Sequence, residues 1–294
     1  MRIADTFKDY SVIATGGGEK LERWGGVVLL RPDPQAIWKP AFDFRKYKGL
    51  NAVYKRGADG GGAWETLKSF PAEWTIGWDG GGANLKFKIK PMGFKHTGLF
   101  PEQSYNWSRM INLIRAAKRP VNVLNLFAYT GGATAACLAA NASVCHVDAS
   151  KGMTERAGEN VRLSGVPVEN LRLLVDDCFK FVAREIRRGK KYDAVIMDPP
   201  SYGRGPNGEM WKLEDNLFEF VKLCGSVLSD NPLFFLINSY TTGLQPAVLL
   251  NILNLALKGR GGNAEAYELC LPTEESGVVL PCGASGLWEL RTGN

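Results

Sequence analysis

An unusual group of residues closes the apolar run Tyr192–Met197: an aspartate, two prolines, a serine and a tyrosine. The Asp198 carboxylate and a backbone carbonyl fixed by proline can together accept hydrogen bonds from both N–H groups of an exocyclic amine. Because proline rings lock φ, Pro199 and Pro200 would hold these carbonyls in place. Tyr202 can stack on a flat ring, which contributes about 1–3 kcal/mol when the ring is a nucleic-acid base. The segment therefore predicts a place that holds an amino group; the alternative is that the prolines merely stop a strand and Tyr202 packs.

Three further apolar runs end in residues that can hold a ligand containing adenosine. The first ends at Phe127 and leads into Gly131 and Gly132, where the backbone can approach a ligand and a helix start offers unpaired N–H groups. The second ends at Asp148, about 20 residues later, where an acid can accept hydrogen bonds from both ribose hydroxyls. The third ends at Asp176–Asp177, where a carboxylate can accept a hydrogen bond from an adenine amino group.

Each of these acids also has a simpler interpretation as the cap of the helix that follows it. Two well-known phosphate-binding patterns are missing: the glycine turn is neither the G-x-G-x-x-G of nicotinamide dehydrogenases nor the G-x-x-x-x-G-K-[ST] of a P-loop. Helix capping explains single acids well. It explains poorly why such residues follow four successive apolar runs, and we therefore favour an adenosyl site.

Apolar runs and helical stretches alternate after Val121, and this arrangement would position the four run ends. Near-continuous apolar strands between helices are typical of a parallel sheet covered on both faces. We predict an α/β fold, a seven-stranded, doubly wound, Rossmann-like sheet, whose ligands bind beyond the carboxyl ends of the strands. The predicted strands lie within residues 121–128, 142–150, 171–177, 192–200, 232–240, 265–271 and 286–290, and the predicted helices within 132–140, 153–163, 179–188, 213–228 and 247–257.

Residues 1–95 have a different pattern of apolar residues and turns. Lysines alternate with apolar residues in NLKFKIKP, residues 84–91, which is the pattern of a half-buried strand, and glycine triplets near residues 16, 60 and 80 predict turns. We predict two domains: a small β-rich domain at 1–95 and the α/β domain at 96–294. Residues 1–120 hold 20 Lys and Arg against 11 Asp and Glu, so this part of the chain suits a polyanion such as RNA, or has a solvated basic face.

The composition limits the remaining classes of protein. No apolar run reaches the ~20 residues that span a bilayer, and the N-terminus lacks the apolar core of a signal peptide. The six cysteines form no C-x-x-C pair, so we expect reduced core thiols and a cytoplasmic location. With two histidines, His96 and His146, a zinc site is not expected. We expect His146 to be a satisfied core residue and His96 to make a hydrogen bond in a loop.

Four segments together resemble the S-adenosylmethionine-dependent methyltransferases of the class I fold: NLFAYTGGATAA, VDASKG, LVDDCFKF and MDPPSYGRG. More closely, they resemble the family that includes the large-subunit ribosomal RNA methyltransferases. The segment KHTGLFPEQ, residues 95–103, is similar to that family's H-x-G-x-F-x-x-Q lead-in, and the likeness covers roughly residues 95–240. The tail VVLPCGASGLWEL resembles a more restricted subgroup of methyltransferases.

The resemblance implies an enzyme that uses S-adenosyl-L-methionine as its cofactor, with roles for particular residues. Phe127, Tyr129, Thr130 and Gly131 would line the methionine part, and Asp148 would hold the ribose. The implied cofactor-binding residues are Gln103, Phe127, Tyr129, Thr130, Gly131, Asp148, Ala149, Ser150, Asp177, Cys178, Phe179 and Asp198. The implied catalytic residues are Asp198, Pro199, Pro200 and Tyr202, where cofactor and substrate meet.

The amine clamp departs in one place from the [DNS]PP[YFW] motif of amino-methylating enzymes, because Ser201 puts the aromatic residue one position late. The rival chemistry, methylation at carbon-5 of a pyrimidine, needs a thiolate nucleophile. The related cytosine enzymes carry a cysteine after the fifth strand, where this chain has Asn238–Thr241. We therefore predict methylation of a base nitrogen and not of cytosine carbon-5. An RNA that contains 5-fluorocytosine should then not trap the protein covalently.

The sequence favours a methyltransferase acting on RNA, ribosomal RNA above all, with a role in RNA methylation and rRNA processing. Two alternatives stay open: a methyltransferase for a protein or small molecule, and a noncatalytic RNA-binding module with a vestigial cofactor pocket. The sequence also leaves open the methylated atom, the role of residues 1–95 and the oligomeric state, a homodimer included. The polar segment Gly203–Asp215 is equally compatible with a mobile lid and a solvated connection.

Overall fold

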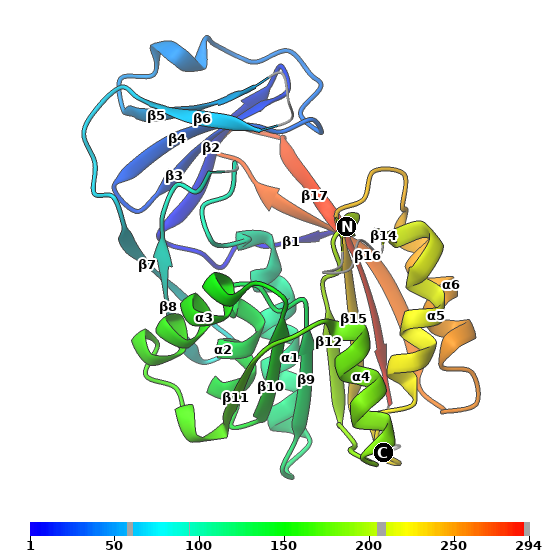
Figure 1. The fold of residues 1–294 in the computed structure, drawn as a ribbon. Coiled ribbons are helices and arrows are strands. Elements are labelled where there is room, and N and C mark those ends of the chain that lie inside the picture. Colours follow the sequence, from blue (N-terminus) through cyan, green and yellow to red (C-terminus); the bar gives the residue numbers. More distant parts are fainter. Residues whose placement is uncertain (58–60, 94, 205–209, 291–294) are drawn as a thin grey trace. The chain divides into compact units, whose positions relative to one another are not determined.

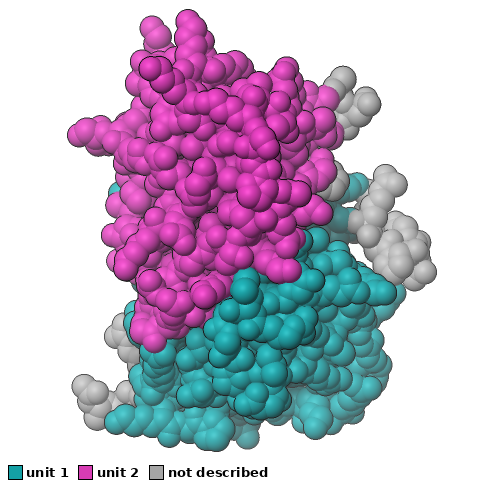
Figure 2. Space-filling model, turned by 90° about the vertical axis from the view of Figure 1, so that its left-hand side faces the viewer, with its two compact units in different colours: residues 1, 106–269, 283–294 teal, residues 2–105, 270–282 magenta. Residues whose placement is uncertain are grey.

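The computed structural model describes residues 1–57, 61–93, 95–204 and 210–290, and its chain divides into two compact units. Unit 1 comprises Met1, residues 106–269 and residues 283–294; unit 2 comprises residues 2–105 and 270–282 (teal and magenta in Figure 2). The chain therefore leaves unit 1 late in its course and returns to it after 13 residues. The assignment of separate functions to residues 1–95 and 96–294 stays a prediction.

The large sheet, whose five parallel strands all lie in unit 1, has the predicted architecture (Figure 1). Five strands lie parallel in the order β15-β12-β9-β10-β11, and β17 pairs antiparallel with β15. All seven predicted strands are present, and a two-residue strand, β1, adds an eighth beside β16. The strands are β1 (Arg2–Ile3), β9 (Asn122–Leu126), β10 (Ser143–Asp148), β11 (Leu171–Val175), β12 (Ala194–Met197), β15 (Phe234–Ser239), β16 (Asn263–Pro272) and β17 (Val279–Glu289).

Helices cover both faces of this sheet, as alternate residues of β9 make clear. Leu124 and Leu126 belong to the buried cluster that includes α4, α5 and α6, whereas Asn125 points the other way and donates to Thr134 of α2. The helices are α1 (Ser104–Ala116), α2 (Gly132–Ala139), α3 (Lys151–Leu163), α4 (Cys178–Arg187), α5 (Leu213–Gly225) and α6 (Pro246–Ala256). The five predicted helices are confirmed within three residues at each end, and α1 was not predicted.

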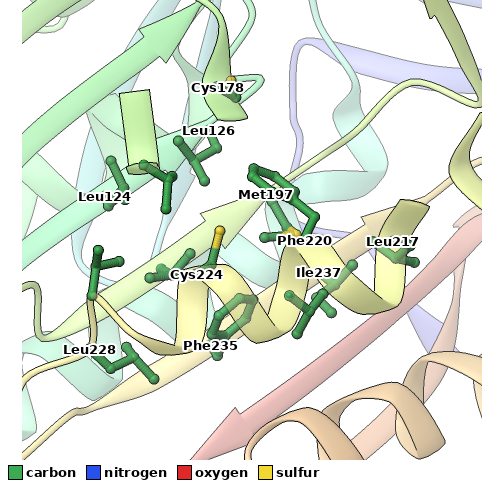
Figure 3. Close-up of a cluster of buried hydrophobic side chains, with 14 of the residues drawn as sticks. Leu124, Leu126, Cys178, Met197, Leu217, Phe220, Cys224, Leu228, Phe235 and Ile237 are labelled. Carbon is green, nitrogen blue, oxygen red and sulfur yellow. The ribbon is translucent and has the colours of Figure 1, made fainter. Parts of the chain in front are cut away.

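The core on the α4–α6 face is built from aliphatic and aromatic side chains of five strands and three helices, part of which Figure 3 shows. Phe220 and Cys224 of α5 lie over Met197 of β12 and Phe235 of β15, and all four are fully buried. Burying such side chains contributes about 1.5–3 kcal/mol each, which fixes the helices on the sheet. The strand ends are therefore held by a rigid base.

Unit 2 is rich in β structure, as predicted. A five-stranded sheet contains β2 (Tyr10–Gly16), β3 (Glu19–Trp24), β4 (Val27–Pro32), β5 (Leu50–Arg56) and β6 (Gly62–Thr66), and a hairpin contains β7 (Trp74–Gly80) and β8 (Ala83–Ile89). Gly16, Gly17 and Gly18 all have positive φ at the β2–β3 turn, which explains the first glycine triplet. The tip of the second triplet, Gly60, lies outside the described residues.

Two features stabilise unit 2 from the inside. Glu22 is fully buried and accepts hydrogen bonds from Tyr10 and from two nitrogens of Arg31. Burial would raise the pKa of the Glu22 carboxyl, but the neighbouring Arg31 and Lys20 lower it to about 2. The excursion 270–282 is tied to β2, because the Glu274 backbone N–H donates to the Val12 carbonyl at 2.8 Å. Part of the tail motif thus completes unit 2.

Candidate functional site

The carboxyl ends of β9, β10, β11 and β12 meet at one edge of the sheet, because the four strands are parallel neighbours. Backbone hydrogen bonds join the segments that leave them. The Ala128 N–H donates to the Val147 carbonyl at 3.2 Å, and the Asp176 N–H donates to the Asp148 carbonyl at 3.0 Å. The predicted ribose, adenine and amine residues of unit 1 therefore lie around one sheet edge.

The turn after β9 has an unusual backbone. Phe127 and Tyr129 have φ of 52° and 51°, a region that non-glycine residues rarely adopt, and Gly131 has φ of 83°. Such conformations cluster where a site must be held in one geometry. A Cβ on Gly131 would lie 2.8 Å from the Cβ of Ala157, so a side chain does not fit there. The turn leads straight into α2, whose first N–H groups have no partner within the helix.

The Asp148 carboxylate is held by two backbone donors. The Tyr129 N–H donates to Oδ2 and the Ser150 N–H donates to Oδ1, both at 2.8 Å. An ionised carboxylate has about four acceptor positions, so the bound donors leave capacity for ribose hydroxyls. Ala149 and Ser150 are exposed beside it, and the Ser150 hydroxyl caps α3 by accepting from the Met153 N–H at 3.4 Å.

Buried polar groups support the β9 turn from below. The Thr130 carbonyl accepts a hydrogen bond from the Asn160 side chain at 2.9 Å. Thr134 of α2 is bonded to Asn125 of β9 and to Nδ1 of His146 in β10, both at 2.9 Å. Burial lowers the pKa of His146 to about 4, so its ring is neutral near pH 7. His146 is buried and bonded through Nδ1, but its buried Nε2 has no hydrogen-bond partner among the described residues, so the prediction of a satisfied core histidine holds for its burial and for one ring nitrogen only.

The acids after β11 have structural duties. The Asp177 side chain caps α4 by accepting from the Lys180 N–H at 2.8 Å, and Asp176 pairs with Arg184. The capping interpretation of Asp177 is confirmed, and its carboxylate keeps further acceptor positions for an adenine amine. Cys178 is buried, and its sulfur lies 3.4 Å from the Phe127 N–H. Burial raises the pKa of this thiol well above its ordinary value, so it is a neutral packing group.

Aromatic rings connect the predicted cofactor residues. Phe179 stacks on Phe220 with ring centroids 3.9 Å apart, and Phe127 lies edge-on to Phe220 at 5.9 Å. Trp211 packs against both rings, with centroids 6.0 Å from Phe127 and 5.1 Å from Phe179. Sequence reasoning missed Trp211, because it lies about 13 residues beyond the proline motif in a polar, glycine-rich stretch with no recognisable spacing.

The turn after β12 is anchored to several elements. The Asp198 N–H donates to the Leu126 carbonyl at 3.4 Å, which places the acid beside the end of β9. Pro199 is buried and Pro200 is exposed. Tyr202 is 51% exposed and begins β13 (Tyr202–Arg204), which pairs antiparallel with β14 (Met210–Lys212). The tyrosine ring is therefore accessible and does not pack in the core.

Three further predictions concern Gln103, the segment Gly203–Asp215 and His96. Gln103 lies in the 3₁₀-helix η2 (Pro101–Gln103) of unit 2, so its assignment to the cofactor stays a prediction. The segment Gly203–Asp215 contains the β13–β14 pair, and residues 205–209 of it lie outside the described residues. His96 lies in unit 2, where its ring contacts Phe100 and its backbone carbonyl accepts from the Met92 N–H.

The described parts of the chain offer neither a metal centre nor a membrane-spanning helix. In residues 1–57, 61–93, 95–204 and 210–290, no cluster of three or more His, Cys, Asp or Glu could hold a metal ion. None of the helices in those same ranges is long and apolar enough to cross a membrane. All six cysteines are free, and five of them are buried.

Comparison with known proteins agrees with this geometry. The profile of the S-adenosylmethionine-dependent methyltransferase family matches residues 30–229. An S-adenosylmethionine-dependent methyltransferase from Agrobacterium tumefaciens, whose crystal structure is known, is 33% identical to this chain in sequence. The two structures match with a TM-score of 0.91, and the match covers 99% of this chain and 94% of that chain. The chain belongs to the S-adenosylmethionine-dependent methyltransferase family.

Curated relatives match a shorter region. Ribosomal RNA large subunit methyltransferase I of Photobacterium profundum is 33% identical over 119 residues, which is 40% of this chain and 29% of that protein. The enzyme of the same name from Erwinia tasmaniensis is 40% identical over 86 residues, 29% of this chain and 22% of that protein. The match thus spans less than a third of these curated relatives.

The residues present fit the family's cofactor. A solved methyltransferase in complex with SAH shares the fold, with a TM-score of 0.74 and 17% identity over 96% of this chain and 76% of that chain. In the present chain, Asp148 keeps acceptor capacity, Gly131 lets the turn pack closely against Ala157, and Phe127 and Phe179 offer apolar ring faces. The chain thus belongs to a family that depends on S-adenosylmethionine, and its activity and the assignment of single residues to the cofactor are proposals.

Proposed function

We propose that this methyltransferase modifies a base nitrogen of RNA, with ribosomal RNA as the first candidate. The observation that carries the proposal is the Asp198–Pro199 pair beside the end of β9, next to the turn that would line the cofactor. The curated relatives support the RNA part, since they are named as methyltransferases of large-subunit ribosomal RNA. S-adenosylmethionine, when bound, supplies an electrophilic methyl group on a sulfonium.

The chain's own contribution would be to hold and polarise the acceptor amine. An exocyclic amine is a poor nucleophile because its lone pair is delocalised into the ring. The Asp198 carboxylate and the Pro199 carbonyl would accept hydrogen bonds from the two N–H groups of the amine. These hydrogen bonds would return electron density to its nitrogen. Holding the nitrogen in line at ~3–3.5 Å from the carbon that it attacks supplies much of the rate. The exposed ring of Tyr202 would stack on the base.

The state of the cysteines supports nitrogen over carbon as the acceptor. Methylation at carbon-5 of cytosine needs a thiolate that adds to carbon-6. Cys178 is the cysteine at the candidate site, and it is buried with a raised pKa. Cys137 and Cys224 lie within α2 and α5, and burial raises the pKa of both thiols as well. The free thiols also support a reducing compartment, and we place the protein in the cytoplasm.

The charge of unit 2 bears on how RNA would be held. Unit 2 contains 16 Lys and Arg against 13 Asp and Glu, a smaller surplus than residues 1–120 suggest. The difference arises because four basic residues after residue 105 belong to unit 1 and two glutamates of 270–282 belong to unit 2. Several basic side chains of unit 2 also pair with acids: Arg45 with Glu19, Lys55 with Glu65, and Lys88 with Glu73.

This charge distribution favours one alternative that stays open, a protein or small molecule as the acceptor. With a surplus of this size, unit 2 would make few phosphate contacts, and the salt dependence of RNA binding would be shallow. Where the acceptor is RNA, unit 2 would contact phosphate through a few exposed basic side chains such as Lys39 and Lys48. An RNA affinity that stays unchanged from low to high salt would contradict this role.

The decisive experiment follows labelled methyl groups from the cofactor into cell fractions. The protein is incubated with tritiated S-adenosylmethionine and with RNA, protein and metabolite fractions from cells that lack it. We expect label in RNA, at a modified base that mass spectrometry finds in normal cells and misses in cells without the protein. Label confined to the protein or metabolite fraction would replace RNA by that acceptor. Failure of the protein to bind SAH at millimolar concentration would favour a noncatalytic RNA-binding module.

A further inference from the structure

One side chain connects the two halves of the candidate site. Trp211 lies in β14, opposite Gly203 of β13. Its indole N–H donates to the Pro200 carbonyl at 2.6 Å, while its ring packs against Phe127 and Phe179. The same residue therefore touches the turn predicted to hold the acceptor and two residues predicted to line the cofactor.

The acceptor turn has two further anchors. The Ser201 carbonyl accepts from the Leu213 N–H at the start of α5, at 3.1 Å. The Ser201 hydroxyl accepts from the Thr241 hydroxyl beyond β15, at 2.6 Å. Three donors from three different elements thus fix two consecutive residues, Pro200 and Ser201. A loop that merely ended a strand would need no such set of bonds, whereas a site that must hold an amine in line does.

We propose that Trp211 is a positioning residue for the acceptor amine, which acts through the Pro200 carbonyl and the ring contacts rather than by touching the reacting atoms. This inference rests on the proposed function of the Asp198–Ser201 turn. The indole occupies one of the two acceptor positions of the Pro200 carbonyl, and the Pro199 carbonyl remains the proposed backbone acceptor of the clamp. The ring of Trp211 also makes the position of that turn depend on the Phe127–Phe179 wall.

The substitution Trp211→Phe tests the hydrogen bond, because phenylalanine keeps an aromatic ring against Phe127 and Phe179 but has no N–H. We expect the single-turnover rate at saturating cofactor and RNA to fall about tenfold, the equivalent of one hydrogen bond. The dissociation constant for SAH should change less than about twofold. Trp211→Ala removes the ring as well, so its affinity for SAH should fall together with the rate.

Trp64→Phe is the matched control, since the Trp64 indole makes the same kind of bond to the Met92 carbonyl in unit 2, at 2.8 Å. That variant should keep both the rate and the SAH affinity. The inference is overturned if Trp211→Phe transfers methyl groups at the wild-type rate. It is equally overturned if its loss of rate only follows a loss of SAH affinity or of thermal stability.

A second measurement separates this inference from the proposed function. The indole N–H resonance of Trp211 is assigned from its disappearance in Trp211→Phe, and its exchange with solvent is measured in the wild-type protein. We expect slow exchange, because the N–H is bonded to the Pro200 carbonyl. Exchange at the rate of a free indole contradicts the inference. Wild-type protein that methylates no RNA contradicts the proposed function alone, and the exchange rate still decides the role of Trp211.

Discussion

The turns after β9 and β12 lie at the same sheet edge but are held in different ways. The β9 turn is shaped by its own backbone, with positive φ at Phe127, Tyr129 and Gly131, and by the nearby Asp148 carboxylate. The β12 turn has prolines of fixed φ. It accepts hydrogen bonds from the side chains of Trp211 and Thr241, which lie further along the sequence. The first turn takes its shape from its own positive-φ backbone and is also bonded to Asp148 and Asn160, whereas the second depends mainly on side chains brought to it by the fold.

This difference suggests a division of labour between the turns. A cofactor shared by a whole family can be bound by a turn whose geometry is written into a short segment. An acceptor that differs from one enzyme to the next is better served by a turn whose supports come from variable, distant parts of the chain. We therefore expect changes at the first turn to affect cofactor binding and folding, and changes at the second to affect transfer.

The largest effect is expected for Asp198→Ala at the second turn. The variant loses one of the two acceptors of the amine, so methyl transfer at saturating cofactor should fall by roughly 10²–10⁴-fold, the range for a side chain that acts in the transition state. SAH affinity, measured by calorimetry, should stay within a few fold. A parallel loss of SAH affinity would show that the two turns are not separate in function.

Gly131→Ala should break the first turn through its backbone. The added Cβ would meet the Cβ of Ala157 at 2.8 Å, and φ of 83° disfavours any side chain. We expect a loss of about 2–4 kcal/mol in the free energy of unfolding, from backbone strain and overpacking together. Gly152→Ala is the matched control in α3, because its Cβ would meet no atom within 4 Å. Equal stability of the two variants in urea titration would contradict this account.

His146 should make the support of the first turn sensitive to acid. Its pKa is about 4 in the folded protein against 6.5 for an ordinary histidine. Below pH 6.5 His146 binds a proton in the unfolded chain but stays neutral in the folded chain. The free energy of unfolding therefore falls as the pH drops towards 4. Between pH 7 and pH 5 this costs roughly 2 kcal/mol. In His146→Gln, the slope of the unfolding free energy against pH should flatten between pH 7 and pH 5. An unchanged slope would contradict the prediction.

Asp148→Asn should have a smaller effect, confined to the cofactor. The amide keeps one oxygen for hydrogen bonding but loses the charge and places an NH₂ group beside a backbone N–H donor. We expect the dissociation constant for SAH to rise about tenfold, as for the loss of one charge-assisted hydrogen bond, while transfer at saturating cofactor changes little. A rate that stays low at saturating cofactor would move Asp148 into the acceptor half of the site.

The sequence predicted the sheet and the residues of the first turn because both are encoded locally. Runs such as VNVLNLFA and the glycine turn before α2 carry their own signal. The supports of the second turn could not be predicted, since Trp211 and Thr241 reach Pro200 and Ser201 only through the pairing of β14 and the end of β15. The helix α1 was missed although its sequence carries a regular apolar face, since Trp107, Met110, Ile111 and Ile114 have helical spacing and are all buried.

The division of the chain was also beyond sequence reasoning. Composition changes near residue 95, yet residues 270–282 belong with unit 2. Their membership depends on hydrogen bonds between β2 and residues about 260 positions later, such as the Thr15 N–H to Glu275 at 2.8 Å. No local pattern in the tail announces a partner so distant in the chain.

A crystal structure of the protein with sinefungin tests the central claim most directly. The account predicts the ribose hydroxyls on the Asp148 carboxylate, the adenine beside Asp177 and Phe179, and the amino-acid portion along the Phe127–Gly131 turn. Sinefungin bound elsewhere, or at this sheet edge without contact to Asp148, would contradict the assignment of the four strand ends to one adenosyl site.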